Sequence, residues 1–195
     1  MKLGPRNGMV FIVSAPSGAG KTTLVNQVVS FFPSRLFRAV TYTTRNPRQG
    51  EVNGKDYYFV SEEEFQKKAK NDEFLESTET YGHSYGTLKD TVRDLRKKGN
   101  VLLVIDVKGA MSVIKEMEAV SIFISPPSIE ELERRIRHRM EDDEEELKKR
   151  MNEANIELEK AAFYDYNLVN DEFTVAAEVL KSIIIAESFR RLKHG

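Results

Sequence analysis

The 195-residue chain contains no cysteine and no tryptophan, and its three histidines are scattered along the sequence. The absence of cysteine excludes disulfide bonds, zinc–thiolate sites and thiol catalysis, and the scattered histidines argue against a histidine-rich metal site. Because 30 lysine and arginine residues are balanced by 31 aspartate and glutamate residues, the net charge of -1 argues against a general nucleic-acid or anionic-membrane binder. No apolar run approaches a membrane span, and the first residues lack the apolar stretch of a signal peptide. We therefore expect a cytoplasmic protein with neither nucleic-acid nor membrane partners.

The segment 14–23, SAPSGAGKTT, is typical of a phosphate-binding loop. It directly follows the apolar run 9–13 and opens an amphipathic segment, which is the strand–loop–helix context that such a loop requires. Gly18 and Gly20 leave the backbone uncovered, so that successive N–H groups can point at a phosphate, and the following helix directs its positive end at the same anion. A purely structural glycine turn is the alternative. The strand before the loop and the helix after it favour the nucleotide site.

Two side chains of this loop carry the expected chemistry. Lys21 would reach the β- and γ-phosphates of a nucleotide, and the Thr22 hydroxyl would ligate Mg²⁺. Ala15 stands where the usual GxxxxGK[ST] pattern has its first glycine, and a small residue still fits that turn. The predicted donor-nucleotide site is formed by Ala15, Pro16, Ser17, Gly18, Ala19, Gly20, Lys21, Thr22 and Thr23.

Short apolar runs alternate with amphipathic segments over much of the chain. Continuous apolar strands that alternate with helices indicate a parallel sheet covered on both faces, and the ligands of such sheets lie beyond the carboxyl ends of the strands. Asp106 directly follows one of the runs, so we expect it near the phosphate loop. The predicted strands are 9–13, 101–105, 120–124 and 167–170, and the predicted helices include 21–32 and about 174–192.

Two segments depart from this alternation. Residues 41–98 are polar, rich in tyrosine and full of turn signals, with a predicted strand at 57–60. Helix starts are predicted at Ser61 and Thr87, because each is followed by an acid three residues later. This segment indicates an inserted α+β subdomain. Residues 134–157 are dense in charge of both signs and include a predicted helix.

A second cluster of anion-binding residues lies in the inserted segment. The run TYTTRNPRQGE places Arg45 and Arg48 beside hydroxyl groups and a proline turn, and Glu76 and the run YGHSYGT follow it. Loop arginines are usually solvated, and aromatic residues at strand spacing usually belong to a core. Taken singly, these residues therefore leave a structural interpretation open.

Taken together, these segments resemble the guanylate kinase family. The family's pattern is matched, in order and over nearly the whole chain, by TTRNPRQGEVNGKDYYFVS, EFLE, YGHSYGT, PPSIEEL and VND. The resemblance implies a kinase of purine nucleotide metabolism and GMP recycling, which transfers the γ-phosphoryl group of ATP, with Mg²⁺, to GMP and yields ADP and GDP. It also implies a P-loop three-layer α/β/α fold with a parallel core sheet. Within that fold it places the core domain at residues 1–40, 99–133 and 158–195, the GMP-binding subdomain at 41–98 and a mobile helical lid at 134–157.

The polar edge of guanine explains the residues that the resemblance assigns to GMP. Guanine presents N1–H and N2–H₂ donors side by side, so that one carboxylate such as Glu76 can accept from both. The hydroxyls of Thr41 and Thr87 can serve the remaining polar edge. Arg45 and Arg48 can form planar, bidentate contacts to the GMP phosphate. The resulting GMP site comprises Thr41, Arg45, Arg48, Tyr57, Glu76, Tyr85, Thr87 and Asp106.

Phosphoryl transfer to GMP asks little covalent chemistry of the protein, because the attacking phosphate oxygen is already an anion and needs no general base. The resemblance therefore assigns catalysis to Lys21 and Arg48, to two lid arginines, Arg139 and Arg150, and to no histidine. The alternative is that these lid arginines only pair with the acidic residues 144–146. A lid that closes over both nucleotides would keep water from consuming ATP.

The chain departs from the family pattern at two positions. Val104 stands where the family usually has an acid, which leaves Asp106 as the sole carboxylate at that strand end, and Met140 stands where a small residue is common. Asn170 and Asp171 match a loop near the adenine of ATP in the family. They could equally form a turn and a helix cap.

Other classes of function fit the same frame. Guanylate-kinase-like scaffold domains bind peptides and have lost catalysis, but such a domain is expected to lack Lys21 and Thr22 or the lid arginines. Another small phosphotransferase would act on a different nucleotide or on a phosphorylated sugar, whereas Glu76 argues for guanine. A GTPase would need an NKxD segment, which the sequence lacks. We expect ATP and GMP as partners, and leave open whether the chain is a monomer or a homodimer.

Overall fold

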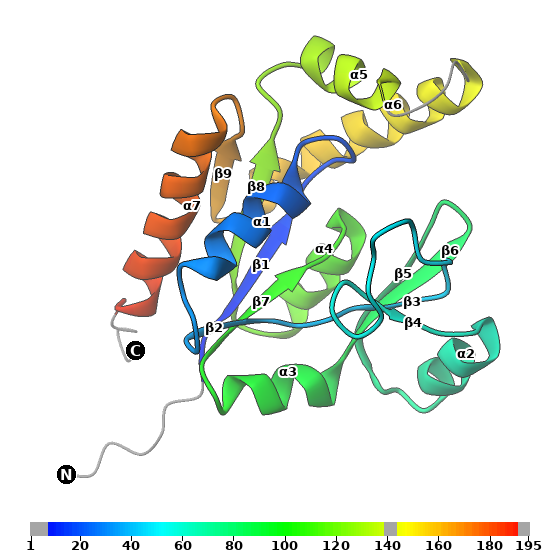
Figure 1. The fold of residues 1–195 in the computed structure, drawn as a ribbon, viewed down its shortest axis with the longest axis vertical. Helices are drawn as coiled ribbons and strands as arrows, with labels where there is room; N and C mark the ends of the chain where they lie inside the picture. Colours follow the sequence, from blue (N-terminus) through cyan, green and yellow to red (C-terminus); the bar gives the residue numbers. More distant parts are fainter. Residues whose placement is uncertain (1–7, 139–143, 191–195) are drawn as a thin grey trace.

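The computed structural model describes residues 8–138 and 144–190. Within these residues the larger sheet has five parallel strands in the order β2-β7-β1-β8-β9 (Figure 1). The four apolar runs form strands as predicted, whereas the short strand β2 has a single buried residue, Leu36, and carries no such signal. The strands are β1 (Val10–Ser14), β2 (Leu36–Arg38), β7 (Asn100–Val104), β8 (Val120–Ser125) and β9 (Tyr166–Val169).

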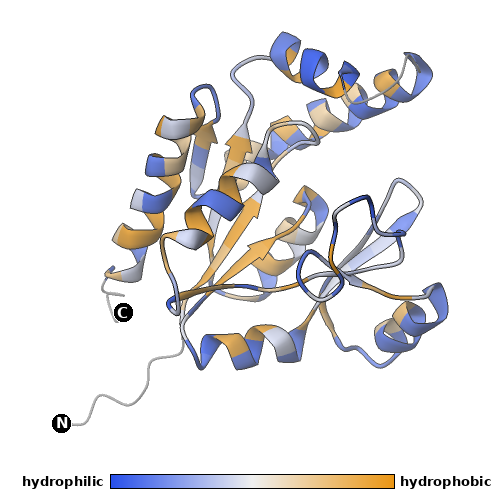
Figure 2. Ribbon diagram, in the orientation of Figure 1, coloured by the Kyte–Doolittle hydropathy of each residue, from blue (hydrophilic) through white to orange (hydrophobic). Residues whose placement is uncertain are grey.

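Helices cover both faces of this sheet. Successive strand residues point to opposite faces, so Phe11 and Val13 pack against one pair of helices, and Val10 and Ile12 pack against another. Figure 2 shows hydrophobic residues concentrated in the strands between the helices. The predicted three-layer α/β/α fold is therefore confirmed. The first pair is α1 (Lys21–Ser30) and α7 (Phe173–Ser188), and the second is α3 (Lys89–Arg96) and α4 (Val107–Glu116).

A second, smaller sheet is built from the inserted segment. Among the described residues it has four strands in the order β4-β3-β6-β5, and helix α2 (Glu62–Lys70) packs beside it through the stacked rings of Phe65 and Phe74. The predicted helix start at Ser61 is confirmed, because its side chain and that of Glu64 form a reciprocal capping box. The strands are β3 (Tyr42–Thr43), β4 (Tyr58–Phe59), β5 (Phe74–Thr80) and β6 (His83–Leu88).

The predicted helix start at Thr87 is wrong. Thr87 lies fully buried in β6 and pairs across the sheet with Glu76 of β5. This pairing continues to Leu88, so α3 begins only at Lys89, and no side-chain cap from the described residues precedes it. Strand pairing between residues far apart in the sequence has overridden a local capping signal.

The charged segment forms two helices above the phosphate loop. Side chains of both helices share a small apolar cluster. Two members of that cluster also reach the phosphate loop, because a Cβ added to Gly18 would lie 3.1 Å from Ile136 and 3.3 Å from Leu132. The helices are α5 (Ile129–Arg137) and α6 (Glu144–Glu159), and the 3₁₀ helix η1 (Lys160–Phe163) follows α6.

The predicted division into core, subdomain and lid stays a prediction. The two sheets and the pair α5–α6 correspond to its three parts (Figure 1). Helix α3 lies inside the predicted subdomain range 41–98, yet it buries Val92 in the core beneath the larger sheet. In the described ranges no helix is both long and apolar enough to cross a membrane.

Candidate active site

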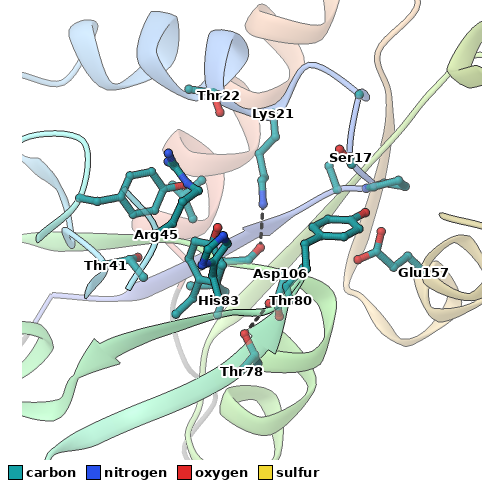
Figure 3. Close-up of a pocket in the computed structure, with 18 of the residues that line it drawn as sticks. Ser17, Lys21, Thr22, Thr41, Arg45, Thr78, Thr80, His83, Asp106 and Glu157 are labelled. Carbon is teal, nitrogen blue, oxygen red and sulfur yellow. Dashed lines mark hydrogen bonds between the residues drawn. The ribbon is translucent and has the colours of Figure 1, made fainter. Parts of the chain in front are cut away.

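A cleft of about 510 Å³ opens at the carboxyl ends of β1 and β7, between the smaller sheet and α6. Figure 3 shows Thr41 and Arg45 on one side of this cleft, Ser17 and Glu157 on the other, and Lys21 between them. Most of the residues predicted for the two nucleotides meet here. From the predicted donor site the lining includes Ala15, Pro16, Ser17, Gly18, Gly20, Lys21, Thr22 and Thr23, and from the predicted acceptor site and lid it includes Thr41, Arg45, Arg48, Tyr57, Glu76, Tyr85, Asp106 and Arg150.

The phosphate loop has the backbone that an anion site needs. Gly18 and Gly20 adopt φ values of 93° and 88°, a region that favours glycine. Gly20 is the N-cap of α1, and no side chain of the described residues caps the helix there. The first N–H groups of α1 are therefore available to an anion at the positive end of the helix. Ala19 is fully buried behind the loop and does not line the cleft.

Asn170 does not line the cleft, but it stabilises the phosphate loop by a hydrogen bond to the loop's backbone. Its Nδ2 donates to the carbonyl of Ala19 over 2.7 Å, and a Cβ added to Gly20 would lie 2.5 Å from that nitrogen. Asp171 is exposed, and helix α7 takes Glu172 as its N-cap. The predicted contact of Asn170 and Asp171 with adenine stays a prediction.

Lys21 is a half-buried cation in the middle of the cleft. Its Nζ donates to the carbonyl of Ile105, at the end of β7, over 3.0 Å. Burial lowers the pKa of Lys21, while the carboxylates of Asp106 and Glu157 oppose this shift. An ammonium that has lost part of its hydration is stabilised by an anion placed beside it, and the phosphate loop can bring one within reach.

Asp106 is held by three donors. Its Oδ1 accepts from the N–H of Gly109 over 2.8 Å and so caps helix α4, while its Oδ2 accepts from the hydroxyls of Thr78 and Thr80 (Figure 3). Sequence reasoning missed both threonines. A usable signal was their spacing, because residues 76, 78 and 80 of one strand point to the same face. In this chain position 104 is a valine and not a second acid, and the polar neighbours of the Asp106 carboxylate are these two hydroxyls.

Glu76 is the buried carboxylate of the acceptor side. It is 5% exposed, and burial raises its pKa to about 7; neighbouring Thr87 opposes the shift and Asp106 adds to it. The Oε1 atom of Glu76 and the Oγ1 atom of Thr87 are both buried without a hydrogen-bond partner among the described residues. Buried polar atoms are costly when unpaired, so this end of the cleft fits a ligand that brings hydrogen-bond donors and an acceptor.

Arg45 lines the same cleft and is held there by aromatic rings and an acid. Its guanidinium carbon lies 5.4 Å from the ring centroid of Tyr57, and its Nη2 pairs with Glu51 over 2.9 Å. Burial works to lower the pKa of Arg45, but Glu51 and Tyr85 outweigh it and raise the pKa. The second oxygen of Glu51 accepts from the backbone N–H of Arg48, whose own side chain is exposed. Glu51, which sequence reasoning did not assign, thus orders the loop that carries both arginines.

Helix α6 closes the remaining side of the cleft. Arg150 lines it and pairs through Nε with Glu146 over 2.9 Å, so the arginine both faces the cleft and makes the acidic contact considered as its alternative role. Glu157 also lines the cleft, and burial raises its pKa to about 7. Arg139 and Met140 lie outside the described residues. Further lining residues that sequence reasoning did not assign are Thr78, Thr80, Tyr81, His83, Val104, Ile105, Glu146 and Glu157.

Comparison with known proteins decides the family. The family model described as guanylate kinase matches residues 7–187. The chain belongs to the guanylate kinase family. It is 48% identical over 186 residues to a guanylate kinase of Protochlamydia amoebophila, which covers 95% of this chain and 94% of that protein. It is 47% identical over 187 residues to a guanylate kinase of Geobacter sulfurreducens, covering 95% and 92% of the two chains.

The solved structures agree with the sequence relatives. The crystal structure of guanylate kinase from Anaplasma phagocytophilum superposes with a TM-score of 0.75 at 34% identity, and covers 95% of this chain and 88% of that one. The family and fold predicted from the sequence are therefore confirmed.

The residues of this guanylate kinase family member also fit a magnesium ion. The described residues contain no group of three histidine, aspartate or glutamate side chains that could hold a metal by themselves. Mg²⁺ characteristically keeps several waters and takes phosphate oxygens of the substrate, so one protein hydroxyl beside a phosphate loop is a suitable partner. The Thr22 hydroxyl, which lines the cleft at the start of α1, is that candidate.

Proposed function

We propose that this guanylate kinase binds ATP at the phosphate loop and GMP at the smaller sheet, and transfers the γ-phosphoryl group between them. The observation that carries this proposal is that one cleft is lined both by the N-terminus of α1, which no described side chain caps, and by the buried carboxylate of Glu76, which has an unpartnered oxygen. Thr87, which pairs with Glu76 across the smaller sheet, lies directly behind this wall of the cleft and also has an unpartnered oxygen. Guanine supplies the missing partners, because its N1–H and N2–H₂ can donate to one carboxylate while its O6 accepts from a hydroxyl.

The acceptor assignment gives a strong preference for guanine. Adenine presents no pair of adjacent ring and exocyclic donors that would match Glu76, so its binding would leave the carboxylate and Thr87 unpaired. A site built to hydrogen-bond its substrate can reject an analogue that lacks the partner groups by roughly 10⁴-fold. Thr41, which is also buried and lines the cleft, completes the polar surround of the base.

The phosphate of GMP then lies toward Arg45 and Arg48. Arg45 is already held against the rings of Tyr57 and Phe59, and a guanidinium fork matches two phosphate oxygens. Tyr85 lines the cleft beside Arg45 and offers a further hydroxyl donor. In the structure the Arg45 guanidinium forms an ion pair with the Glu51 carboxylate. We therefore infer that the GMP phosphate either binds the remaining donors of this guanidinium or displaces the Glu51 carboxylate from it.

The chain contributes positioning and positive charge to the transfer. Lys21 stabilises the charge of the donor phosphates, and Arg150 faces the same space from α6. We assign Arg139 to the same task from the sequence. Mg²⁺ bound to the ATP phosphates and Thr22 would neutralise charge on the phosphoryl group. Closure of α5–α6 over the cleft would exclude water and so prevent hydrolysis of ATP.

A coupled assay with Mg²⁺, ATP and each of the four nucleoside monophosphates tests this proposal. We expect rapid ADP formation with GMP, and rates lower by orders of magnitude with AMP, CMP and UMP. Turnover of AMP equal to that of GMP would refute the role of Glu76. A failure to turn over any of the four would refute the proposed function.

A further inference from the structure

The turn between β5 and β6 carries an aromatic residue in an unusual backbone conformation. Tyr81 has a φ of 52° and Gly82 a φ of 72°, and these two residues alone join the strands. A two-residue hairpin turn with both φ values positive strongly favours Asn-Gly or Gly-Gly. A bulky residue in this region is unfavourable, and such positions cluster at functional sites. The turn itself therefore does not explain why residue 81 is a tyrosine.

The side chain of Tyr81 contacts the lid arginine. The guanidinium carbon of Arg150 lies 4.7 Å from the centroid of the Tyr81 ring, and both residues line the cleft. Glu146, one turn before Arg150 on α6, holds its Nε over 2.9 Å. Burial and the nearby carboxylate of Glu153 raise the pKa of Tyr81, so its hydroxyl remains protonated.

These contacts join two parts of the cleft that are distant in sequence. Tyr81 follows the strand that carries Glu76, while Arg150 belongs to α6. A guanidinium stacked on a ring keeps the donors of its terminal nitrogens in its own plane, where phosphate oxygens can reach them. An arginine held by a ring and a carboxylate also loses less rotamer freedom when the phosphates arrive.

We propose that Tyr81 is a positioning residue for phosphoryl transfer, whose ring holds the guanidinium of Arg150 over the cleft and couples the guanine-binding strand to helix α6. The inference rests on the proposed function, because Arg150 affects turnover only if a phosphoryl group is transferred in this cleft.

The first test separates the ring from the turn. Tyr81→Asn installs the favoured Asn-Gly turn but removes the ring, so the melting temperature stays unchanged or rises. The loss of a cation–π contact lowers kcat roughly threefold to tenfold. The separate variant Tyr81→Phe keeps the ring, so its kcat should stay within about twofold of the wild-type value. The control is Phe31→Leu, which removes a similar contact between Lys181 and Phe31, 4.5 Å apart and remote from the cleft, and leaves kcat unchanged.

The second test asks whether Tyr81 acts through Arg150. In an Arg150→Ala background, Tyr81→Asn should change kcat by less than about 1.5-fold, because the partner of the ring is gone. An undiminished loss in that background, or wild-type kcat in the single variant Tyr81→Asn, overturns the inference. A wild-type chain that does not phosphorylate GMP refutes the proposed function instead, so the two failures are distinguishable.

Discussion

The donor and acceptor sides of the cleft are built in different ways. The donor side is a single run of backbone, residues 14–23, fixed to the core by β1, α1 and the side chain of Asn170. The acceptor side is assembled from side chains of β5 and β6, from Thr41 just before β3, and from an exposed loop that is ordered by Glu51. A phosphate needs backbone N–H groups and one cation, whereas a base must be recognised by several separate polar groups. We therefore expect changes on the donor side to reduce all turnover and changes on the acceptor side to alter selectivity.

The largest effect is expected from Lys21→Met. Removing the cation from the transition state should lower kcat/KM roughly 10³-fold for GMP and equally for any slow substrate, as measured in the coupled assay. The melting temperature should not fall, because the Lys21 ammonium loses hydration in the cleft, which lowers its pKa. Lys115→Met, on the exposed side of α4, serves as control and should leave kcat/KM unchanged. A loss of less than tenfold in Lys21→Met would contradict the donor assignment.

Glu76→Gln should produce the next largest effect and should act on one nucleotide only. The amide N–H₂ group of glutamine is a donor and cannot accept a hydrogen bond from guanine, whose N1–H and N2–H₂ are also donors. We therefore expect kcat/KM for GMP to fall roughly 10²-fold, while KM for ATP stays constant. Glu79→Gln, an exposed change on the same strand, is the matched control. Parallel losses for both nucleotides would contradict the separation of the two sides.

Arg48→Ala should weaken GMP binding more modestly. The loss of a charge-assisted contact to phosphate should raise KM for GMP roughly tenfold to fiftyfold and leave KM for ATP nearly unchanged. Initial-rate kinetics with each nucleotide varied in turn measure both constants. Lys55→Ala, in the same exposed loop, controls for a general loss of positive charge. An equal rise of both KM values would place Arg48 outside the acceptor side.

The smallest effect is a pH dependence confined to GMP. Because burial raises the pKa of Glu76 to about 7, the carboxyl gains a proton as the pH falls below 7 and can no longer accept from both guanine donors. Between pH 7 and pH 6, kcat/KM for GMP should fall by about fivefold, because the ionised fraction of a group with this pKa falls from about one half to about one tenth. Glu76→Gln provides the baseline, since the phosphate of GMP titrates equally in both enzymes. Identical pH profiles for the two enzymes would contradict this role of Glu76.

The same contrast explains what could be predicted from the sequence. The phosphate loop is contiguous, so its glycines, Lys21 and Thr22 were predicted from a short motif together with the strand before it and the helix after it, and the apolar runs indicated the parallel sheet. The residues around Asp106 come together only through strand register, which is why Thr78 and Thr80 were missed. Thr87 illustrates the same limit, since a local helix signal there was overridden by pairing with β5.

The lid side was the hardest to predict. Tyr81 and Glu157 reach the cleft because α6 packs over the hairpin turn, a contact between residues some 70 positions apart that no short motif encodes. The resemblance to the guanylate kinase family supplied Arg150 but not the ring beneath it. Sequence patterns thus identify which groups carry charge, whereas tertiary packing decides what holds those groups in place.

A crystal structure with GMP and a non-hydrolysable ATP analogue tests the central claim most directly. The account predicts the guanine N1 and N2 atoms within hydrogen-bond distance of Glu76, the GMP phosphate on Arg45, and the Lys21 ammonium moved from the Ile105 carbonyl to the donor phosphates. Guanine bound elsewhere, with the Glu76 carboxylate still unpartnered while both nucleotides are present, would contradict it.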